Sequence, residues 1–317
     1  MTVTLRSFTP DDAPRLAAIA TESSCADGQP IAVTAEEILE EFCIPNCDPA
    51  TDVVVACTGE EIVGYGFTYM LHNPGGDERC YVFGHVDPPM RRRGIGSLIL
   101  DATIRRATEI LRSSHGAGDQ FVRTDCLDTN ADARALFERA GLTPVRWFTE
   151  LARTIEPPLE AIIPEGVAIE PWSAHPEEVL RTLKNDAFAD HWGSTPTSLE
   201  NWRQLTSGFG ARPDLSFVAV ANETPVGLLL THRYPLDDEL IGARYGWIDK
   251  LATSRSWRGK GIASSLIAHA IDAYRAEHLT HVALGVDASS QTGANRLYES
   301  LGFTTLRNTV TYSVTLS

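Results

Sequence analysis

Two short segments combine arginine with closely spaced glycine in a chain that is acidic overall. RRRGIG runs from Arg91 to Gly96, and RGKGIA runs from Arg258 to Ala263. Each follows a strand-like run and precedes an apolar run with helical spacing. The free N–H groups and the dipole at the start of such a helix favour an anion, and glycine lets a phosphate approach the backbone. Arginine adds positive charge, so each segment predicts a pyrophosphate site.

Two other phosphate-binding motifs do not describe these segments. A P-loop needs Ser or Thr directly after Gly-Lys, and here Gly261 follows Lys260. The dinucleotide-binding fingerprint needs three glycines in the spacing G-x-G-x-x-G, which neither segment has. The prediction is therefore a pyrophosphate bound at a helix N-terminus, without either of those folds.

The same order of elements surrounds both segments. The helix, strand, helix and strand patterns that follow them cover 97–111, 121–126, 131–141 and 145–153 in the first half, and 262–274, 280–286, 294–302 and 308–316 in the second. Gly94 and Gly261 are 167 residues apart, and Phe137 and Tyr298 are 161 apart. A tandem duplication explains this near-constant offset. Capping boxes beginning at Thr34 and at Thr197 predict a further helix in each half.

The repeat predicts an α/β (α+β) protein with two domains. We expect the domains at residues 1–153 and 167–317, joined by a linker over 154–166 whose three prolines discourage regular structure. Each domain is expected to hold a mixed, mostly antiparallel sheet with helices on both faces. Because two similar halves can pack about a pseudo-twofold axis, we expect a monomer, with a dimer as the alternative.

Composition excludes several classes of partner. The net charge of −15 argues against general binding to nucleic acid or to an anionic membrane. No apolar run approaches the length of a membrane span, and the first residues do not form a signal peptide, so a cytoplasmic protein is expected. All six cysteines lie in the first half without metal-ligand spacing, which predicts free thiols and no metal site.

The two segments and their surroundings resemble a known family. VDPPMRRRGIGSLIL and TSRSWRGKGIASSLI, each followed by a strand and then by LFERAGL or LYESLGF, are similar to two motifs of the GCN5-related N-acetyltransferases. The resemblance covers essentially the whole chain. The two-domain layout, with NDAFADHWG early in the second half, is similar to that of the mycothiol synthases and other actinobacterial tandem acetyltransferases.

This resemblance implies a cofactor and its ligands. The Arg-x-x-Gly-x-Gly/Ala loop would hold the pyrophosphate of acetyl-coenzyme A, and the pantetheine arm would lie between two splayed central strands. The cofactor-binding residues expected on this basis are Val86, Arg91, Arg92, Arg93, Gly94, Ile95, Gly96 and Asn130 in the first half, and Thr253, Arg258, Gly259, Lys260, Gly261, Ile262 and Ala263 in the second.

The chemistry of acetyl transfer suggests which half is catalytic. The amine must lose a proton, the oxyanion needs an N–H donor, and the leaving thiolate benefits from a proton donor. In the family that donor is often a Tyr in the motif LYExxGF, which is Tyr298 here, whereas the first half has Phe137. Seven residues before these aromatics, the first half has Asn130, the usual family residue, and the second has Gln291.

Other candidate residues each have two readings. Asp249 is expected to be the base, or else to form an ion pair with Lys250; Val82 stands at the same position in the first half. His191 and Trp192 are expected to wall the acceptor site, or to cap and pack the end of a helix. His85 is expected to face away from the side of Val82 and is not taken as a base.

The sequence thus predicts an acetyl-coenzyme A-dependent N-acetyltransferase that acts on a small primary amine. Two rivals stay open: an enzyme that acetylates protein N-termini or lysines, and an acyl-coenzyme A-binding regulatory protein without turnover. The acidic composition favours a cationic acceptor such as an amino sugar or polyamine.

Overall fold

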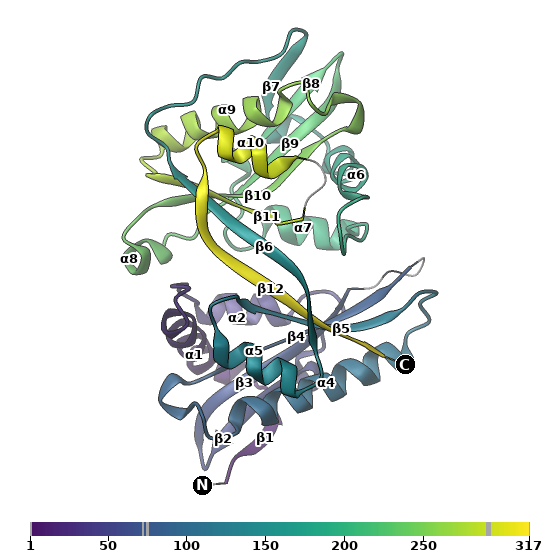
Figure 1. Ribbon diagram of the computed structural model, residues 1–317, viewed down its shortest axis with the longest axis vertical. Helices are drawn as coiled ribbons and strands as arrows, with labels where there is room; N and C mark the ends of the chain where they lie inside the picture. The colour runs from purple at the N-terminus through teal and green to yellow at the C-terminus, as the bar shows by residue number, and fades with distance from the viewer. Residues whose placement is uncertain (1, 72, 74–75, 290–292, 317) are drawn as a thin grey trace. The chain divides into compact units, whose positions relative to one another are not determined.

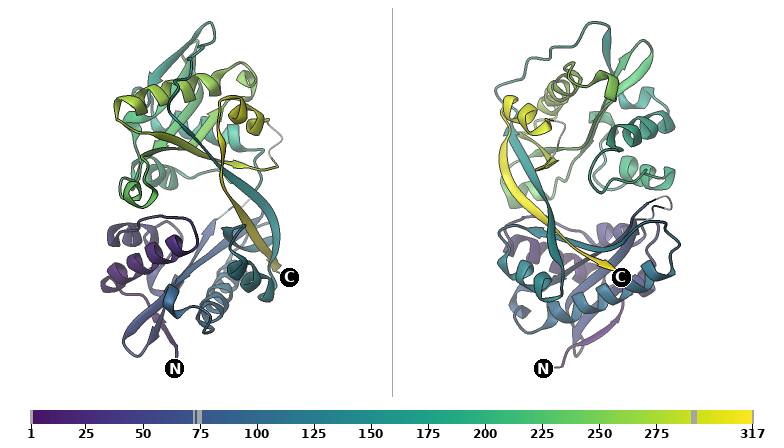
Figure 2. Two further views of the ribbon diagram at one scale, coloured as in Figure 1. Left: turned by 60° about the vertical axis from the view of Figure 1, so that its left-hand side comes forward. Right: turned by 45° about the vertical axis from the view of Figure 1, so that its right-hand side comes forward.

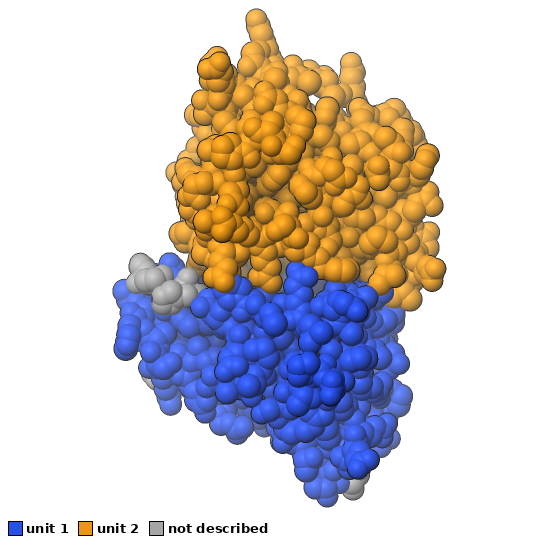
Figure 3. Space-filling model, turned by 180° about the vertical axis from the view of Figure 1, so that it is seen from behind, with its two compact units in different colours: residues 1–147, 308–317 blue, residues 148–307 orange. Residues whose placement is uncertain are grey.

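The computed structural model describes residues 2–71, 73, 76–289 and 293–316. The chain forms two compact units, coloured in Figure 3. Unit 1 comprises residues 1–147 and 308–317, and unit 2 comprises residues 148–307.

The elements follow the same order in both halves of the chain, apart from the short helices α3 and α8 (Figure 1). The first half contains β1 (Thr4–Ser7), α1 (Ala13–Ala26), α2 (Ala35–Phe42), α3 (Pro49–Asp52), β2 (Val53–Thr58), β3 (Glu61–Leu71), β4 (Glu78–Val86), α4 (Ile95–Ser113), β5 (Gln120–Leu127), α5 (Ala131–Arg139) and β6 (Thr143–Thr154). The second half contains β7 (Val167–Pro171), α6 (Glu177–Phe188), α7 (Leu199–Ser207), β8 (Phe217–Ala221), β9 (Thr224–His232), α8 (Asp237–Ile241), β10 (Tyr245–Thr253), α9 (Ile262–Ala276), β11 (His281–Asp287), α10 (Ala294–Ser300) and β12 (Thr304–Leu316).

Each unit has a mixed, mostly antiparallel sheet, as expected. In unit 1 the strand order is β1-β2-β3-β4-β5-β12, and in unit 2 it is β7-β8-β9-β10-β11-β6. In each sheet one pair is parallel, β4 with β5 and β10 with β11, and the other neighbours run antiparallel. The repeated topology agrees with a tandem duplication.

The sixth strand of each sheet comes from the other half of the chain. Residues 309–316 of β12 pair with β5 in unit 1, and residues 148–154 of β6 pair with β11 in unit 2. Val310 and Tyr312 of β12 are fully buried in the core of unit 1. The units therefore differ from the domains expected at 1–153 and 167–317, because each final strand is exchanged rather than returned to its own half.

Helices cover both faces of each sheet, as the two views in Figure 2 show. In unit 1, α1 and α2 pack on one face, where Leu16, Ile19 and Phe42 are buried; α4 packs on the other face. Unit 2 repeats this with α6 and α7 on one face and α9 and α10 on the other. In each unit the two helices before the second strand and the two helices after the loop therefore lie on opposite faces of the sheet.

A glycine at the same place in both sheets lets the helix after the loop pack closely. A Cβ on Gly64 would lie 3.0 Å from Ile99 Cδ1, and one on Gly227 would lie 2.6 Å from Ile262 Cγ2. Since real side chains do not approach so closely, these two positions need glycine to hold α4 and α9 against their sheets.

Local predictions near the helix ends had mixed outcomes. The capping box at Thr34 is confirmed, because Thr34 Oγ1 accepts from Glu37 N at 3.1 Å and Glu37 accepts from Thr34 N at 2.7 Å. The box expected at Thr197 is wrong: Ser198 caps α7 by accepting from Asn201 N. α6 ends at Phe188, so His191 and Trp192 follow the helix.

Candidate active site

The parallel strands of each sheet separate at equivalent points. Pairing of β4 with β5 ends at Tyr81 and Arg123, and pairing of β10 with β11 ends at Ile248 and Leu284. A cavity opens beyond each point, with a volume of about 380 Å³ in unit 1 and about 460 Å³ in unit 2. Both cavities extend to the start of the helix that follows the Arg-Gly loop, so each joins the splayed strands to a predicted pyrophosphate site.

The two Arg-Gly loops share one backbone conformation. Left-handed residues alternate along each loop: Arg92 and Gly94 in unit 1, and Gly259 and Gly261 in unit 2, with φ between 63° and 87°. Gly94 and Gly261 are the N-caps of α4 and α9. Such alternation turns successive N–H groups toward one point and makes an anion-binding concavity. A Cβ on Gly94 or Gly259 would meet no atom within 4 Å, so the loop surface there is open.

The first arginine of each loop braces the backbone. Arg91 Nε donates to the carbonyl of Val86, and Arg258 Nε donates to that of Thr253, both at 3.4 Å. Arg91 also donates to Ser23 O and binds Asp27, while Arg258 donates to Ala187 O at 2.7 Å. Both arginines therefore tie the loop to the first helix segment of their unit. That both arginines bind the cofactor stays a prediction.

The remaining basic side chains are differently engaged. Arg92 forms an exposed ion pair with Asp132 at 2.5 Å. Arg93 donates to Pro89 O at 3.3 Å. Lys260 lies over the Trp257 ring, 4.6 Å from its centre. These contacts are weak and solvent-exposed, so an anion at either loop can draw on these charges.

The predicted cofactor residues are only partly brought together. Those that line the unit 1 cavity are Val86, Gly96 and Asn130; those that line the unit 2 cavity are Thr253, Arg258, Gly259, Gly261, Ile262 and Ala263. Asn130 caps α5 by accepting from Ala133 N at 3.0 Å. Gln291, its counterpart in the second half, lies outside the described residues.

Tyr298 lines the unit 2 cavity from α10. It is 8% exposed and packs edge-on against Phe303. Burial raises the pKa of Tyr298 to about 12, so its hydroxyl is protonated at neutral pH. Phe137 lines the unit 1 cavity at the corresponding place and packs against Tyr312, whose hydroxyl is engaged by Arg134 and Glu138. At this position the unit 2 cavity is thus lined by a phenol, and the unit 1 cavity by a phenyl ring.

Asp249 occupies a β-bulge that unit 1 does not have. The β9–β10 register shifts between Ile248 and Lys250, whereas β3 and β4 pair without a shift from Gly64–Val86 to Leu71–Arg79. A bulge leaves its extra residue out of the ladder and re-aims its side chain. It places Asp249 where the two central strands separate.

The surroundings of Asp249 favour the ion-pair reading over that of a base. Its carboxylate forms the expected ion pair with Lys250 at 2.8 Å, and His232 Nδ1 lies 3.9 Å away. Desolvation opposes ionisation of Asp249, but the charge of Lys250 and then that of His232 outweigh it and hold its pKa below the usual value. The carboxylate is therefore ionised at neutral pH and is a weak base.

A second, smaller cavity of about 240 Å³ surrounds Asp249 in unit 2. Its lining, which comes from four strands and the turn after β9, is Glu150, His232, Tyr234, Trp247, Ile248, Asp249 and Gly285. Glu150 binds Arg307 at 2.6 Å. Gly285 is exposed, and a Cβ there would meet nothing within 4 Å, so the floor of the cavity is open. Lys250 and Arg307 pair with the two carboxylates, so a small ligand that carries a positive charge would find the two aromatic rings and would share these carboxylates with the two cations.

Sequence reasoning missed most of this second cavity. Glu150 escaped notice because β6 was assigned to the first half, and its strand pairs with Gly285 of β11 only after the exchange. His232 carried a weak signal, an ionisable residue ending an otherwise apolar strand pattern.

A buried lysine lies near this cavity. Lys184 on α6 is 6% exposed, donates to Thr197 Oγ1 at 2.5 Å, and lies 5.6 Å from the centre of the Phe188 ring. Burial, together with the nearby charge of Lys250, lowers the pKa of Lys184 to about 8. It was not among the predicted residues, because a lone lysine in a helix is ordinary in sequence.

The remaining candidate residues are His191 and Trp192, with His85 as the histidine that was set aside. His191 lines the larger cavity of unit 2 beside Phe188, 4.4 Å between ring centres, and burial lowers its pKa. Trp192 packs against Phe148, 6.2 Å between ring centres. His85 faces away from the side of Val82, as expected: its ring lies 5.5 Å from that of Tyr65, in the core with α1 and α2, whereas Val82 packs in the core with α4. Burial lowers the pKa of His85 to about 4, so it is neutral at pH 7.

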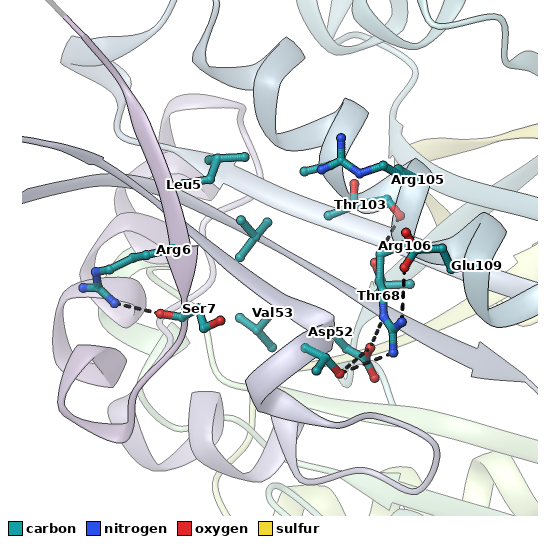
Figure 4. Close-up of a pocket in the computed structure, with 13 residues that line it drawn as sticks. Leu5, Arg6, Ser7, Asp52, Val53, Thr68, Thr103, Arg105, Arg106 and Glu109 are labelled. Carbon is teal, nitrogen blue, oxygen red and sulfur yellow. Dashed lines mark hydrogen bonds and ion pairs between the residues drawn. The ribbon is translucent and has the colours of Figure 1, made fainter.

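Another concavity of unit 1 lies apart from the splayed strands (Figure 4). It has a volume of about 400 Å³ and lies between β1 and α4. Its charged groups largely neutralise one another: Arg6 binds Asp12, and Arg106 binds Asp52, both at 2.7 Å. It therefore offers less to an anion than the Arg-Gly loops do.

The described residues hold no candidate membrane span and no candidate metal cluster. Within them, no helix is long and apolar enough to cross a membrane, and no three His, Cys, Asp or Glu side chains are grouped to hold a metal ion. All six cysteines are free thiols.

The chain is similar to known acetyltransferases. A family model described as acetyltransferase (GNAT) family matches residues 19–142 and again residues 177–303. The mycothiol acetyltransferase of Thermobispora bispora is 29% identical over 249 residues, 78% of each chain. That of Kocuria rhizophila is 27% identical over 300 residues, 91% of each chain. A solved structure, a GCN5-related N-acetyltransferase from Sphaerobacter thermophilus, matches with a TM-score of 0.76 and 25% identity, over 99% of this chain and 95% of that one.

Proposed function

The chain belongs to the acetyltransferase (GNAT) family, whose model matches both of its halves, and from this premise we propose that it transfers an acetyl group from acetyl-coenzyme A to the primary amine of a small molecule, with unit 2 as the catalytic unit. It is an acyltransferase, in agreement with its mycothiol acetyltransferase relatives. The proposal concerns the acyl donor, the acceptor and the division of work between the units.

The unit 2 cavity fits the proposed coenzyme. The open, alternating left-handed loop from Arg258 to Ala263 offers backbone N–H groups to a pyrophosphate at the N-terminus of α9. From there a cavity of about 460 Å³ leads past Thr253 to Tyr298 and suits the pantetheine arm. The coenzyme supplies an acetyl thioester when bound.

Asp249 and the smaller cavity serve the acceptor. An ammonium with a pKa near 10 enters protonated, and the ionised carboxylate of Asp249 holds it beside the rings of Trp247 and Tyr234. Because its pKa is low, Asp249 is better suited to orienting the amine than to keeping its proton. The proton passes onward to solvent at the exposed side of the cavity.

Tyr298 stabilises the departing sulfur. With a pKa of about 12 the phenol is a weaker acid than a thiol, whose reference pKa is about 8.5. Tyr298 therefore acts by donating a hydrogen bond to the developing thiolate, and complete proton transfer is not required.

The observation that carries this proposal is that unit 2 has three features that unit 1 does not have at the matching positions: the bulge and the carboxylate at the smaller cavity, and the phenol in the larger one. Val82 and Phe137 occupy the positions of Asp249 and Tyr298 in unit 1. The small volume of the acceptor cavity favours a small molecule over a protein N-terminus or lysine.

A screen of amines with acetyl-coenzyme A tests the proposal. Release of free coenzyme A is followed for the wild type and for two matched variants, Gly261→Glu and Gly94→Glu, which place a carboxylate at the same point of each loop. We expect turnover with a small cationic amine, abolished by Gly261→Glu and retained in Gly94→Glu. The reverse pattern would move catalysis to unit 1. Binding without coenzyme A release from any amine would support a regulatory acyl-coenzyme A-binding protein.

A further inference from the structure

The connection between β6 and β7, residues 155–166, is fastened along the whole of α9 (Figure 1). At the C-terminal end of α9, Arg275 binds Glu156 at 2.8 Å. Leu159 then packs against the core of unit 2. Four residues into α9, Ser265 donates to the carbonyl of Ile162 at 2.6 Å. We call residues 159–165 the strap.

The strap reaches the Arg-Gly loop of unit 2. A Cβ placed on Gly261 would lie 3.8 Å from Pro164 Cγ, so Pro164 stands beside the N-cap of α9. Ser265 is only 1% exposed beneath this segment. The strap is thus a fixed wall next to the predicted pyrophosphate site, and its sequence was expected only to be a linker.

In the described part of unit 1, the matching helix position is more exposed. Leu98 is the counterpart of Ser265 by the 167-residue offset of the two loops, and it is 37% exposed. The same helix position is therefore fully covered in unit 2 and partly exposed in unit 1.

Two isoleucines project from the strap into solvent. Ile162 is 74% exposed and Ile163 is 44% exposed, although the adjoining backbone is held by Ser265 and Pro164. Two large apolar side chains fixed at the surface beside an anion-binding loop form a ready apolar contact for a ligand that extends past that loop.

We propose that the strap is the adenosine subsite of unit 2, in which Ile162 and Ile163 pack against the purine ring of the coenzyme. This inference rests on the proposed function. With the acyl end of the coenzyme at Tyr298 and its pyrophosphate at Gly261, the 3′-phosphoadenosine would extend beyond the loop, and Pro164 places the strap beside that loop. The strap is the fixed apolar surface found there, and Lys260 in the same loop supplies a positive charge for the ribose phosphate.

The test measures binding by calorimetry in the full chain carrying Gly94→Glu, so that unit 2 supplies the signal. The double variant Ile162→Ser/Ile163→Ser is compared with Val179→Ser, an exposed apolar residue of α6 that is 41% exposed. Coenzyme A is the full probe, and 4′-phosphopantetheine, which has no adenosine, is the truncated one. We expect the double variant to bind coenzyme A about tenfold more weakly and to bind 4′-phosphopantetheine with unchanged affinity. Val179→Ser should change neither affinity.

The outcomes separate this inference from the proposed function. Equal weakening of both probes would mean that the strap only stabilises the loop, and no weakening of either would mean that adenosine lies elsewhere; either result overturns the inference while the coenzyme site stands. If the parent chain binds neither probe, the proposed coenzyme site of unit 2 is wrong and the inference fails with it. Unchanged melting temperatures for the double variant exclude a folding defect.

Discussion

Units 1 and 2 share one scaffold and differ at the positions where it could do chemistry. Both have the splayed parallel strands, the alternating left-handed loop and the arginine that braces this loop to the strand end. Around the cavities, however, unit 1 has Val82, Phe137 and Tyr69 at the positions where unit 2 has Asp249, Tyr298 and His232. The loop and strand frame is therefore shared by the two units, whereas the side chains around the cavities differ.

The difference extends to the sheet itself. Unit 1 carries a continuous row of aromatic rings across β3 and β4, including Tyr69, Tyr81 and Phe83, whose ring planes are nearly parallel. Unit 2 has a bulge and ionisable side chains at the same level of β9 and β10. A regular strand pair suits stacked rings, whereas a bulge re-aims a side chain into the gap. The variants below exchange these features one at a time.

The largest effect is expected for Tyr298→Phe, which gives unit 2 the residue of unit 1. Turnover should fall about 100-fold or more, because the leaving thiolate loses its hydrogen-bond donor, while coenzyme affinity hardly changes. Steady-state kinetics with the acceptor found in the amine screen, together with calorimetry, provide the measurement. The ring remains, so the melting temperature should hold.

Phe137→Tyr is the matched control for that change. It places a phenol in unit 1 without the bulge or the carboxylate, and we expect no gain in turnover. Full activity of Tyr298→Phe would show that water or another group serves the thiolate. In that case the Gly261→Glu and Gly94→Glu pair decides which unit works.

Asp249→Asn should lower kcat/KM about 30-fold, because a charged hydrogen bond to the ammonium is replaced by a neutral one. The lowered pKa keeps Asp249 ionised well below neutral pH, so the loss should be the same from pH 6 to 9. A profile of kcat/KM against pH checks this. A limb near neutral pH that is present in the wild type and absent from Asp249→Asn would instead make Asp249 the general base.

Lys184→Ala copies Ala20, the matching residue of α1, and should remove a pH dependence of stability. The pKa of Lys184 is about 8 in the folded chain against 10.5 for a free lysine. Between these values the unfolded chain binds more protons, so the wild type gains stability as pH rises. From pH 8 to 9.5 this gain should be about 1.5 kcal/mol relative to the variant. Denaturant titrations at both pH values measure it.

Cysteine and tyrosine side chains of the unfolded chain also titrate near this range, so the difference between the two proteins is the informative quantity. Equal pH dependence of wild type and Lys184→Ala would contradict the burial of the charged amine.

Much of this fold follows from the sequence, because the repeat and the hydrophobic periods are local signals. The loops, their helices and the Thr34 capping box are all where the pattern put them. The exchange of β6 and β12 was missed, since strand propensity does not name a pairing partner. Each of these strands is 12 or 13 residues long, more than a single small sheet needs, and that length was the available clue.

The candidate site was predictable where a motif framed it. Tyr298 and Asp249 were predicted because their neighbours in the sequence fixed their positions. Glu150, His232 and Trp247 were missed because they meet only after distant strands pair. The bracing role of Arg91 and Arg258 was also hidden, since sequence shows a charge without showing the carbonyls and carboxylate that engage it.

The smallest effect concerns the loops themselves. Arg92 and Gly259 occupy the same left-handed position, with φ of 63° and 72°. An L side chain there costs about 1–2 kcal/mol, whereas glycine adopts the conformation freely but loses more chain entropy on folding. The ion pair between Arg92 and Asp132 is exposed at both ends and adds little. Arg92→Gly should therefore stabilise the chain by about 0.5 kcal/mol.

Gly259→Ala should destabilise the chain by about 1 kcal/mol, although a Cβ there meets no atom within 4 Å. Urea unfolding of both variants measures the two signs, and the same sign for both would mean that backbone strain does not distinguish the loops.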